Sequence, residues 1–129
     1  MTDTTKLIIP LPLMSLNKYV NAERSNRYRG ANVKKSMTEI CRVHSLKAKN
    51  KGLIIQTPFK ATFHWYVKDK RQDLDNIVFQ QKFIFDGMIK AGLIENDGYK
   101  QHRQSEHFYC IDKNERVEVV FEKVSDNNV

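Results

Sequence analysis

Two aspartates, Asp73 and Asp75, are separated by one residue and directly follow the cations Lys70 and Arg71. The residue pattern predicts a strand before them and a helix after them, so the pair falls at a strand-to-helix junction. A third carboxylate, Asp97, follows that helix in a predicted loop. Carboxylate sets without His or Cys suit Mg²⁺ or Mn²⁺. In a basic chain, this donor set indicates metal-dependent chemistry on the phosphodiester bonds of nucleic acid.

Each of these carboxylates also has an ordinary structural explanation. Asp73 or Asp75 would cap the N-terminus of the predicted helix and favour its positive end. Asp97 precedes Gly98, and an Asp-Gly turn is common and specific to no function. A cap needs only one aspartate, so the second favours a metal site. Asp97 is a candidate metal ligand only because the other two carboxylates are present.

Lys82 falls on the predicted helix together with Asp75, Phe79 and Asp86, at steps of four, three and four residues. On a continuous helix these residues share one stripe, and Lys82 lies about two turns and roughly 10 Å beyond Asp75. Its side chain leans toward the helix N-terminus, where it would offset charge developing on a phosphate. The alternative is a surface pair of Lys82 with Asp86, worth only tenths of a kcal/mol.

The formal net charge of +7 is unevenly distributed. Residues 1–51 contain 11 Lys and Arg against 3 Asp and Glu, whereas residues 52–129 contain 11 against 12. We therefore expect the N-terminal part to contact phosphates and the remainder to hold a cation, although an ordinary solvated basic surface would give the same counts. The cations expected to position DNA through its phosphates are Arg24, Arg27, Arg29, Lys34 and Lys35.

Length and composition favour one domain over residues 1–129, with residues 1–5 and 125–129 frayed and 40% apolar side chains to form a core. No run approaches the roughly 18 apolar residues of a membrane span, and the N-terminus lacks signal-peptide features. Cys41 and Cys110 are the two cysteines, with no CxxC spacing. We therefore expect no disulfide scaffold, no zinc site and a reduced cytosolic compartment.

The predicted fold class is α+β, with a small mixed sheet of about four strands and two helices packed on it. Strict alternation makes Phe59 to Val67 the clearest strand. The predicted elements are an edge strand or extended arm at 6–13, a polar loop with a short helical turn at 16–20, a helix at 31–47, a strand at 59–67, a helix at 75–91 that Gly92 ends, and strands at 103–111 and 116–123 joined by a hairpin turn at 112–115. The stripe expected to be buried on the first helix is Val33, Met37, Ile40, Cys41 and His44.

Three segments carry a family resemblance: 73–76 (Asp-Leu-Asp-Asn), 82–87 (Lys-Phe-Ile-Phe-Asp-Gly) and 92–97 (Gly-Leu-Ile-Glu-Asn-Asp). Together with Leu11-Pro12 and Ser15-Leu16-Asn17, they resemble the RusA family of Holliday-junction resolvases of phages and prophages. The resemblance covers most of residues 7–123, and its specificity lies in residues 70–97.

The resemblance implies a Mg²⁺-dependent endonuclease that resolves four-way DNA junctions in recombination and repair. It also implies a homodimer in the cytoplasm of a bacterial or phage-infected cell. The site residues that it implies are the catalytic and metal-binding Asp73, Asp75 and Asp97, the catalytic Lys82, the DNA contact Asn17, and the secondary candidates Asp86 and Asn96.

The chain departs from the family pattern at two places. It has three more residues between Asp75 and Lys82 than the shortest members, and it has Asn96 where the family often has a second aspartate. Two other functions remain open from the residues alone. The first is a DNA-binding module without catalysis, and the second is an RNA nuclease with the same metal chemistry.

Overall fold

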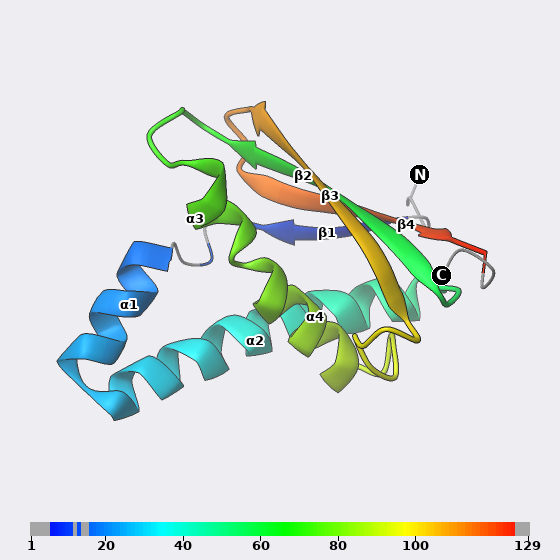
Figure 1. Ribbon diagram of the computed structural model, residues 1–129, viewed down its shortest axis with the longest axis horizontal. Coiled ribbons are helices and arrows are strands. Elements are labelled where there is room, and N and C mark those ends of the chain that lie inside the picture. The colour runs from blue at the N-terminus through cyan, green and yellow to red at the C-terminus, as the bar shows by residue number, and fades with distance from the viewer. Residues whose placement is uncertain (1–5, 12, 14–15, 126–129) are drawn as a thin grey trace.

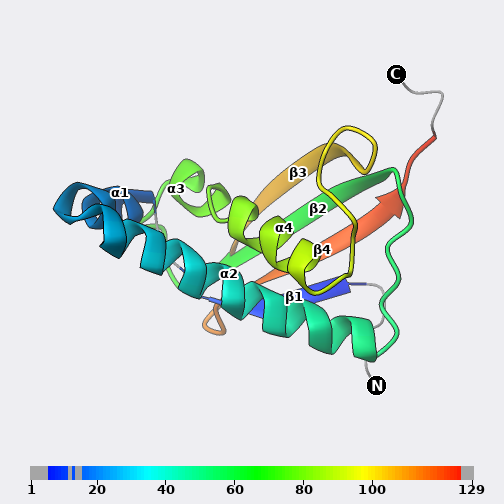
Figure 2. The same ribbon diagram turned by 90° about the horizontal axis from the view of Figure 1, so that it is seen from below.

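The computed structural model describes residues 6–11, 13 and 16–125. Its elements are β1 (Lys6–Pro10), α1 (Leu16–Ser25), α2 (Arg27–Asn50), β2 (Phe59–Val67), α3 (Leu74–Val78), α4 (Gln81–Lys90), β3 (His102–Ile111) and β4 (Arg116–Lys123). The strands form one mixed sheet, and α2 and α4 lie on the same face of it (Figure 1 and Figure 2). The predicted α+β class with about four strands is confirmed. Pro12, Ser15 and the chain ends at 1–5 and 126–129, which entered the predictions, lie outside the described residues.

The sheet has the strand order β1-β4-β2-β3. β2 is parallel to β3 and antiparallel to β4, and β1 is antiparallel to β4. Residues 6–10 therefore form an edge strand, one of the two outcomes predicted for this segment. Pro10 is its last residue, and an edge strand tolerates a residue without an N–H to donate.

Residues 112–115 do not form the predicted hairpin turn, because β3 and β4 lie on opposite sides of β2 and do not pair with each other. The segment passes over the end of β2, where the N–H of Asp112 donates to the carbonyl of Val67 at 2.9 Å. Neighbouring strands are about 4.8 Å apart, so four residues easily span two strand spacings. Sequence spacing alone fits either connection, which is why the prediction was wrong.

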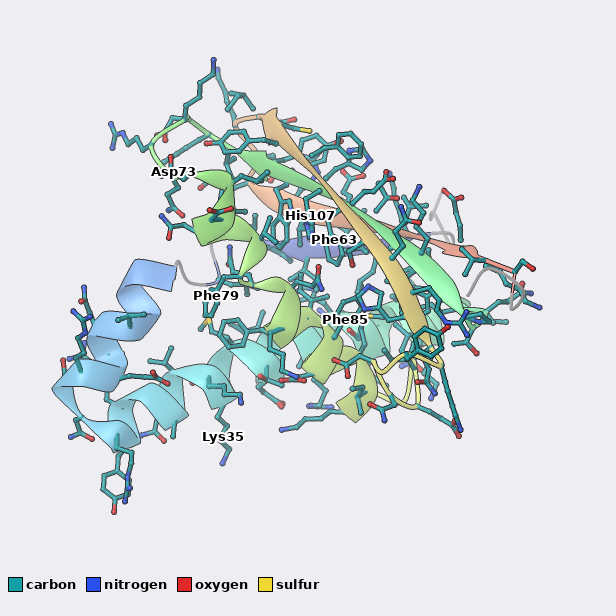
Figure 3. The ribbon with its side chains drawn as sticks, in the orientation of Figure 1. Lys35, Phe63, Asp73, Phe79, Phe85 and His107 are labelled. Carbon is teal, nitrogen blue, oxygen red and sulfur yellow. The ribbon has the colours of Figure 1, made fainter. Side chains whose placement is uncertain are left out.

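The core lies between the sheet and the two helices on its face. The alternation predicted for β2 is confirmed, since Phe59, Ala61, Phe63 and Trp65 are all fully buried. Phe85 of α4 meets this row edge-on, with its ring centroid 5.9 Å from that of Phe63. Figure 3 shows these two side chains in the layer between sheet and helix.

α1 and α2 are longer than predicted. The side-chain oxygen of Asn26 accepts hydrogen bonds from the N–H groups of Tyr28 and Arg29, so α2 begins at Arg27 rather than near Ala31. The polar composition of residues 15–30 indicated a loop, but residues 16–25 form α1 and residues 27–30 begin α2. Its polar residues are compatible with a helix because most of the described ones are exposed.

The buried face of α2 also differs from the predicted stripe. Its buried residues are Gly30, Thr38, Cys41 and Ser45, whereas Ile40 is 39% exposed. The physical reason is the close approach of α4, where Gly87 packs directly against Cys41. Small side chains permit this approach, so the helix buries its small residues there rather than its largest apolar ones.

The predicted helix at 75–91 is broken into α3 and α4. The carbonyl of Ile77 accepts from both the backbone N–H and the side-chain amide of Gln80, each at 3.1 Å. Lys82 N–H bonds the carbonyl of Phe79, three residues back, in place of a regular i−4 bond. This tightened turn removes the continuous stripe that was expected to carry Asp75 and Lys82 together.

Among the helices that the structure describes, none combines the length and the apolar character needed to cross a membrane.

Candidate active site

Lys82 lies next to two carboxylates that come from different parts of the chain. Its Nζ is 3.1 Å from Oδ1 of Asp86, one turn further along α4, and 3.9 Å from Oδ2 of Asp97. α4 ends at Lys90, and Gly92, with a φ of 75°, turns the chain out of the helix, as its sequence position predicted. The loop that follows brings Asp97 back to the start of the helix. The predicted Lys82–Asp86 pair is thus present, and a long-range contact is added to it.

The electrostatics of this cluster keep the lysine charged. The pKa of Lys82 is raised by its hydrogen bond with Asp86, and the charges of Asp86 and Asp97 raise it further, against a smaller desolvation effect. The Lys82 side chain is 61% exposed, whereas those of Asp86 and Asp97 are 22% and 25% exposed. The ammonium group of Lys82 is therefore exposed to solvent, and two partly buried carboxylates contact it.

Asn96 has a definable part in this loop. Its side-chain oxygen accepts a hydrogen bond from the backbone N–H of Asp97 at 2.8 Å. The carbonyl of the following Gly98 accepts from the N–H groups of Gln101 and His102. Asp97 thus lies directly before a turn, as the Asp97-Gly98 sequence predicted. The turn and the contact with Lys82 coexist.

Asp73 and Asp75 lie at the start of α3. Asp73 is the N-cap residue by position, but its side chain makes no capping hydrogen bond. Asp75 lies in the first turn, and both aspartates are exposed. Capping therefore does not occupy either carboxylate. Figure 3 shows Asp73 where the chain leaves the sheet for the short helix.

The loop before Asp73 is fixed to the sheet by Tyr109 of β3. The Tyr109 hydroxyl shares its one O–H hydrogen between the carbonyls of Asp69 and Gln72, each at 3.0 Å. Burial raises the pKa of Tyr109, and the charges of Asp69 and Asp73 raise it further. The phenol thus remains protonated and holds the loop that leads to the aspartate pair.

The three predicted metal ligands are not brought together as a set. Within the described part of the chain, no three His, Cys, Asp or Glu side chains gather closely enough to hold one metal ion. The structure brings Asp97 to Lys82 and Asp86, and it leaves Asp73 and Asp75 at the start of α3. The donor chemistry of the pair, two exposed carboxylates unoccupied by capping, fits a hard cation such as Mg²⁺.

The predicted DNA contacts lie along α1 and α2. Arg24 is in the last turn of α1, Arg27 and Arg29 are in the first turn of α2, and Lys34 and Lys35 follow. All five side chains are exposed. Asn17 lies in α1, and its side chain is outside the described part of the structure.

Sequence reasoning missed Lys90 and Thr38, which line a cavity with Lys34 and Asp86. The spacing of Asp86 and Lys90, four residues apart, could have indicated one helix face. No sequence signal indicated that α2 would cover this face.

No protein-family model matches the chain, and no curated protein matches it either.

Proposed function

We propose that this protein is a metal-dependent endonuclease that cuts branched DNA, with four-way junctions as its preferred substrate. The observation that carries the proposal is the contact between Lys82 and Asp97. These residues are fifteen positions apart and were both singled out for chemistry from the sequence. Their approach at 3.9 Å gives the loop carboxylate a defined place beside a charged lysine.

In this proposal Lys82 acts on the scissile phosphate. Its ammonium group is largely exposed and is held by Asp86 from within the same helix. A cation fixed in this way offsets negative charge as it develops on the phosphoryl oxygens. Asp86 is then a positioning residue, because it acts through Lys82 rather than on the substrate.

The aspartates at the start of α3 would hold the metal ion. Asp73 and Asp75 offer two carboxylates two residues apart, and Asp97 would complete the set when the ion binds. Mg²⁺, with Mn²⁺ as a substitute, supplies Lewis-acid activation of the phosphate and of water. The proposal requires Asp97 and the α3 pair to approach each other on binding, since they do not form one cluster in the described structure.

The exposed cations of α1 and α2 would bind the DNA backbone. Arg24, Arg27, Arg29, Lys34 and Lys35 carry no base-reading geometry by themselves, so they would position DNA by its phosphates, with Asn17 beside them. A homodimer would place two sites on the symmetric strands of a junction, in the cytoplasm of a bacterial or phage-infected cell. These statements rest on the resemblance to the RusA family.

The non-catalytic alternative has one observation in its favour, namely the exposed cations of α1 and α2, which would bind a DNA backbone without any catalysis. The test incubates purified protein with a labelled four-way junction, a matched duplex and a structured RNA, each with Mg²⁺ and with EDTA. We expect Mg²⁺-dependent nicks in the junction on a denaturing gel. Binding without nicking would favour the DNA-binding module, and preferential cutting of RNA would favour the RNA nuclease.

A further inference from the structure

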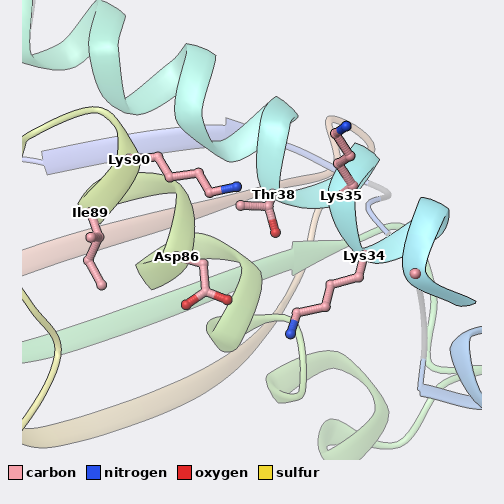
Figure 4. Close-up of a pocket in the computed structure, with 7 residues that line it drawn as sticks. Lys34, Lys35, Thr38, Asp86, Ile89 and Lys90 are labelled. Atoms are coloured by element: carbon pink, nitrogen blue, oxygen red, sulfur yellow. The ribbon is translucent and has the colours of Figure 1, made fainter.

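A cavity of about 410 Å³ lies between α2 and α4, and Figure 4 shows the side chains that line it. Lys34 and Thr38 come from α2, and Asp86, Ile89 and Lys90 come from α4. Lys34 extends from α2 toward Asp86 and Lys90 extends from α4 toward Thr38, whereas Lys35 points away (Figure 4). The cavity thus gathers cations from two helices that are far apart in sequence.

The acids near the cavity are also paired with other cations. Asp86 is bound by Lys82 at 3.1 Å. Glu39 receives two hydrogen bonds from Arg42, at 2.9 and 2.6 Å. Among the described residues, neither Lys34 nor Lys90 takes part in an ion pair. The lining of the cavity has three lysines, Lys34, Lys35 and Lys90, and one acid, Asp86, so its net charge is positive.

We propose that this cavity binds a phosphate of a nucleic-acid backbone between the ammonium groups of Lys34 and Lys90. A lysine offers a point charge with three rotatable donors, which suits a phosphate approached from any direction. Ile89 and the lysine stems give the cavity apolar walls that suit the adjoining sugar. The volume accommodates a sugar-phosphate unit but not a duplex, so the backbone enters at one point.

The position of Asp86 connects this cavity to the candidate active site. Asp86 lines the cavity and also binds Lys82, which contacts Asp97. A backbone held in the cavity would therefore lead directly to Lys82. That the ligand is nucleic acid rests on the proposed function, but the cavity and its charge do not.

The test measures binding of a fluorescein-labelled DNA duplex by anisotropy in EDTA, over a series of NaCl concentrations. The log–log slope of affinity against salt becomes shallower by about 0.9 for each phosphate that the protein no longer neutralises. Because one phosphate lies between the two ammonium groups, we expect the double variant Lys34→Ala/Lys90→Ala to flatten the slope by about one unit, and each single variant to flatten it by part of that. Lys35→Ala is measured beside them. Ala31→Phe fills the cavity from α2 without changing any charge. It should weaken binding and flatten the slope as well.

Thermal melts of each variant ensure that only folded protein is compared. Unchanged slopes for Lys34→Ala, Lys90→Ala and Ala31→Phe would overturn the proposal, as would an effect confined to Lys35→Ala, which would place DNA on the outer face of α2. Tight binding of inorganic phosphate by the wild type, abolished in Lys34→Ala while DNA binding is unchanged, would assign the cavity to a small phosphate ligand instead and likewise overturn it. A chain that binds DNA through the cavity but never cuts a junction supports this inference and overturns the endonuclease. Junction cutting by the wild type, together with unchanged salt slopes in the cavity variants, would support the endonuclease and overturn this inference.

Discussion

Gly87 of α4 lies directly against Cys41 of α2, so that a Cβ added to Gly87 would stand 2.5 Å from the Cβ of Cys41. The same added atom would lie 2.6 Å from the backbone nitrogen of Arg42. Backbone atoms of a packed helix cannot move aside without moving the helix. This contact therefore sets the spacing of α2 and α4, and with it the width of the cavity between Lys34 and Lys90.

Gly87→Ala should destabilise the protein by roughly 1–3 kcal/mol, the usual cost of forcing an extra methyl group into a packed core. The measurement is the free energy of unfolding from urea titration. Gly98→Ala is the matched control, since its added Cβ would meet only Gln101 Oε1, at 4.0 Å. Equal stability of the two variants would mean that the helices are not held at this distance.

His107 of β3 should make stability depend on pH. Its Nδ1 accepts a hydrogen bond from Nε1 of Trp65 at 2.9 Å, and its ring stacks on Phe63 (Figure 3). Burial lowers the pKa of His107 below the ordinary 6.5, and the charge of His102 lowers it further. The unfolded chain therefore takes up the proton first as the pH falls. The stabilisation is complete above pH 6.5 and is lost as the pH falls through the folded pKa.

Trp65 is the single tryptophan of the chain, so its fluorescence reports this protonation directly. We expect an emission change with a midpoint below pH 6.5 in the folded protein. His107→Asn keeps an acceptor near the Nδ1 position but does not titrate. Its emission should stay constant, and the pH dependence of its unfolding free energy should be shallower. His102 and His44, whose pKa values are also lowered by burial, would contribute to the slope that remains. An identical titration in the variant would contradict the assignment to His107.

The sequence predicted the parts of the fold that depend on local pattern. The alternation from Phe59 to Trp65 identified β2 because both the pattern and the burial have a period of two residues. Gly92 identified the end of α4 because few other residues accept a positive φ. The strand order was not predictable, since the 112–115 connection suits adjacent strands and strands separated by one other.

The candidate site was likewise predictable from the sequence only in part. The residue types of Asp73, Asp75, Lys82 and Asp97 indicated metal-dependent chemistry. The prediction that Asp75 and Lys82 share one stripe, however, assumed one continuous helix. The helix is interrupted between Val78 and Gln81, where the N–H and the side-chain amide of Gln80 both bond the carbonyl of Ile77, a local arrangement that helix periodicity does not report. The approach of Asp97 to Lys82 depends on the path of the loop after Gly92 and was likewise invisible from spacing.

Asp75→Asn should lower junction cleavage in Mg²⁺ by orders of magnitude while DNA binding in EDTA persists. The change removes a charged metal ligand but keeps the size of the side chain and a polar residue in the first turn of α3. Single-turnover cleavage and anisotropy measure the two quantities separately. Glu95→Gln is the matched control, because Glu95 is an exposed acid close to Asp97 in sequence. The Glu95 variant should cleave the junction at the normal rate. Near-normal cleavage by the Asp75 variant would remove this residue from the site.

Lys82→Met should slow cleavage more than it weakens binding, because an ammonium group that acts on the transition state contributes little to the affinity of the ground state. The methionine keeps much of the apolar stem and deletes the charge held by Asp86 and Asp97. Stability should change by only tenths of a kcal/mol, since the lysine side chain is mostly exposed. Lys60→Met is the control, because it deletes a comparable pair with Glu106, at 3.0 Å, away from these residues. A Lys82 variant that cuts as fast as the Lys60 variant would reduce Lys82 to a surface partner of Asp86.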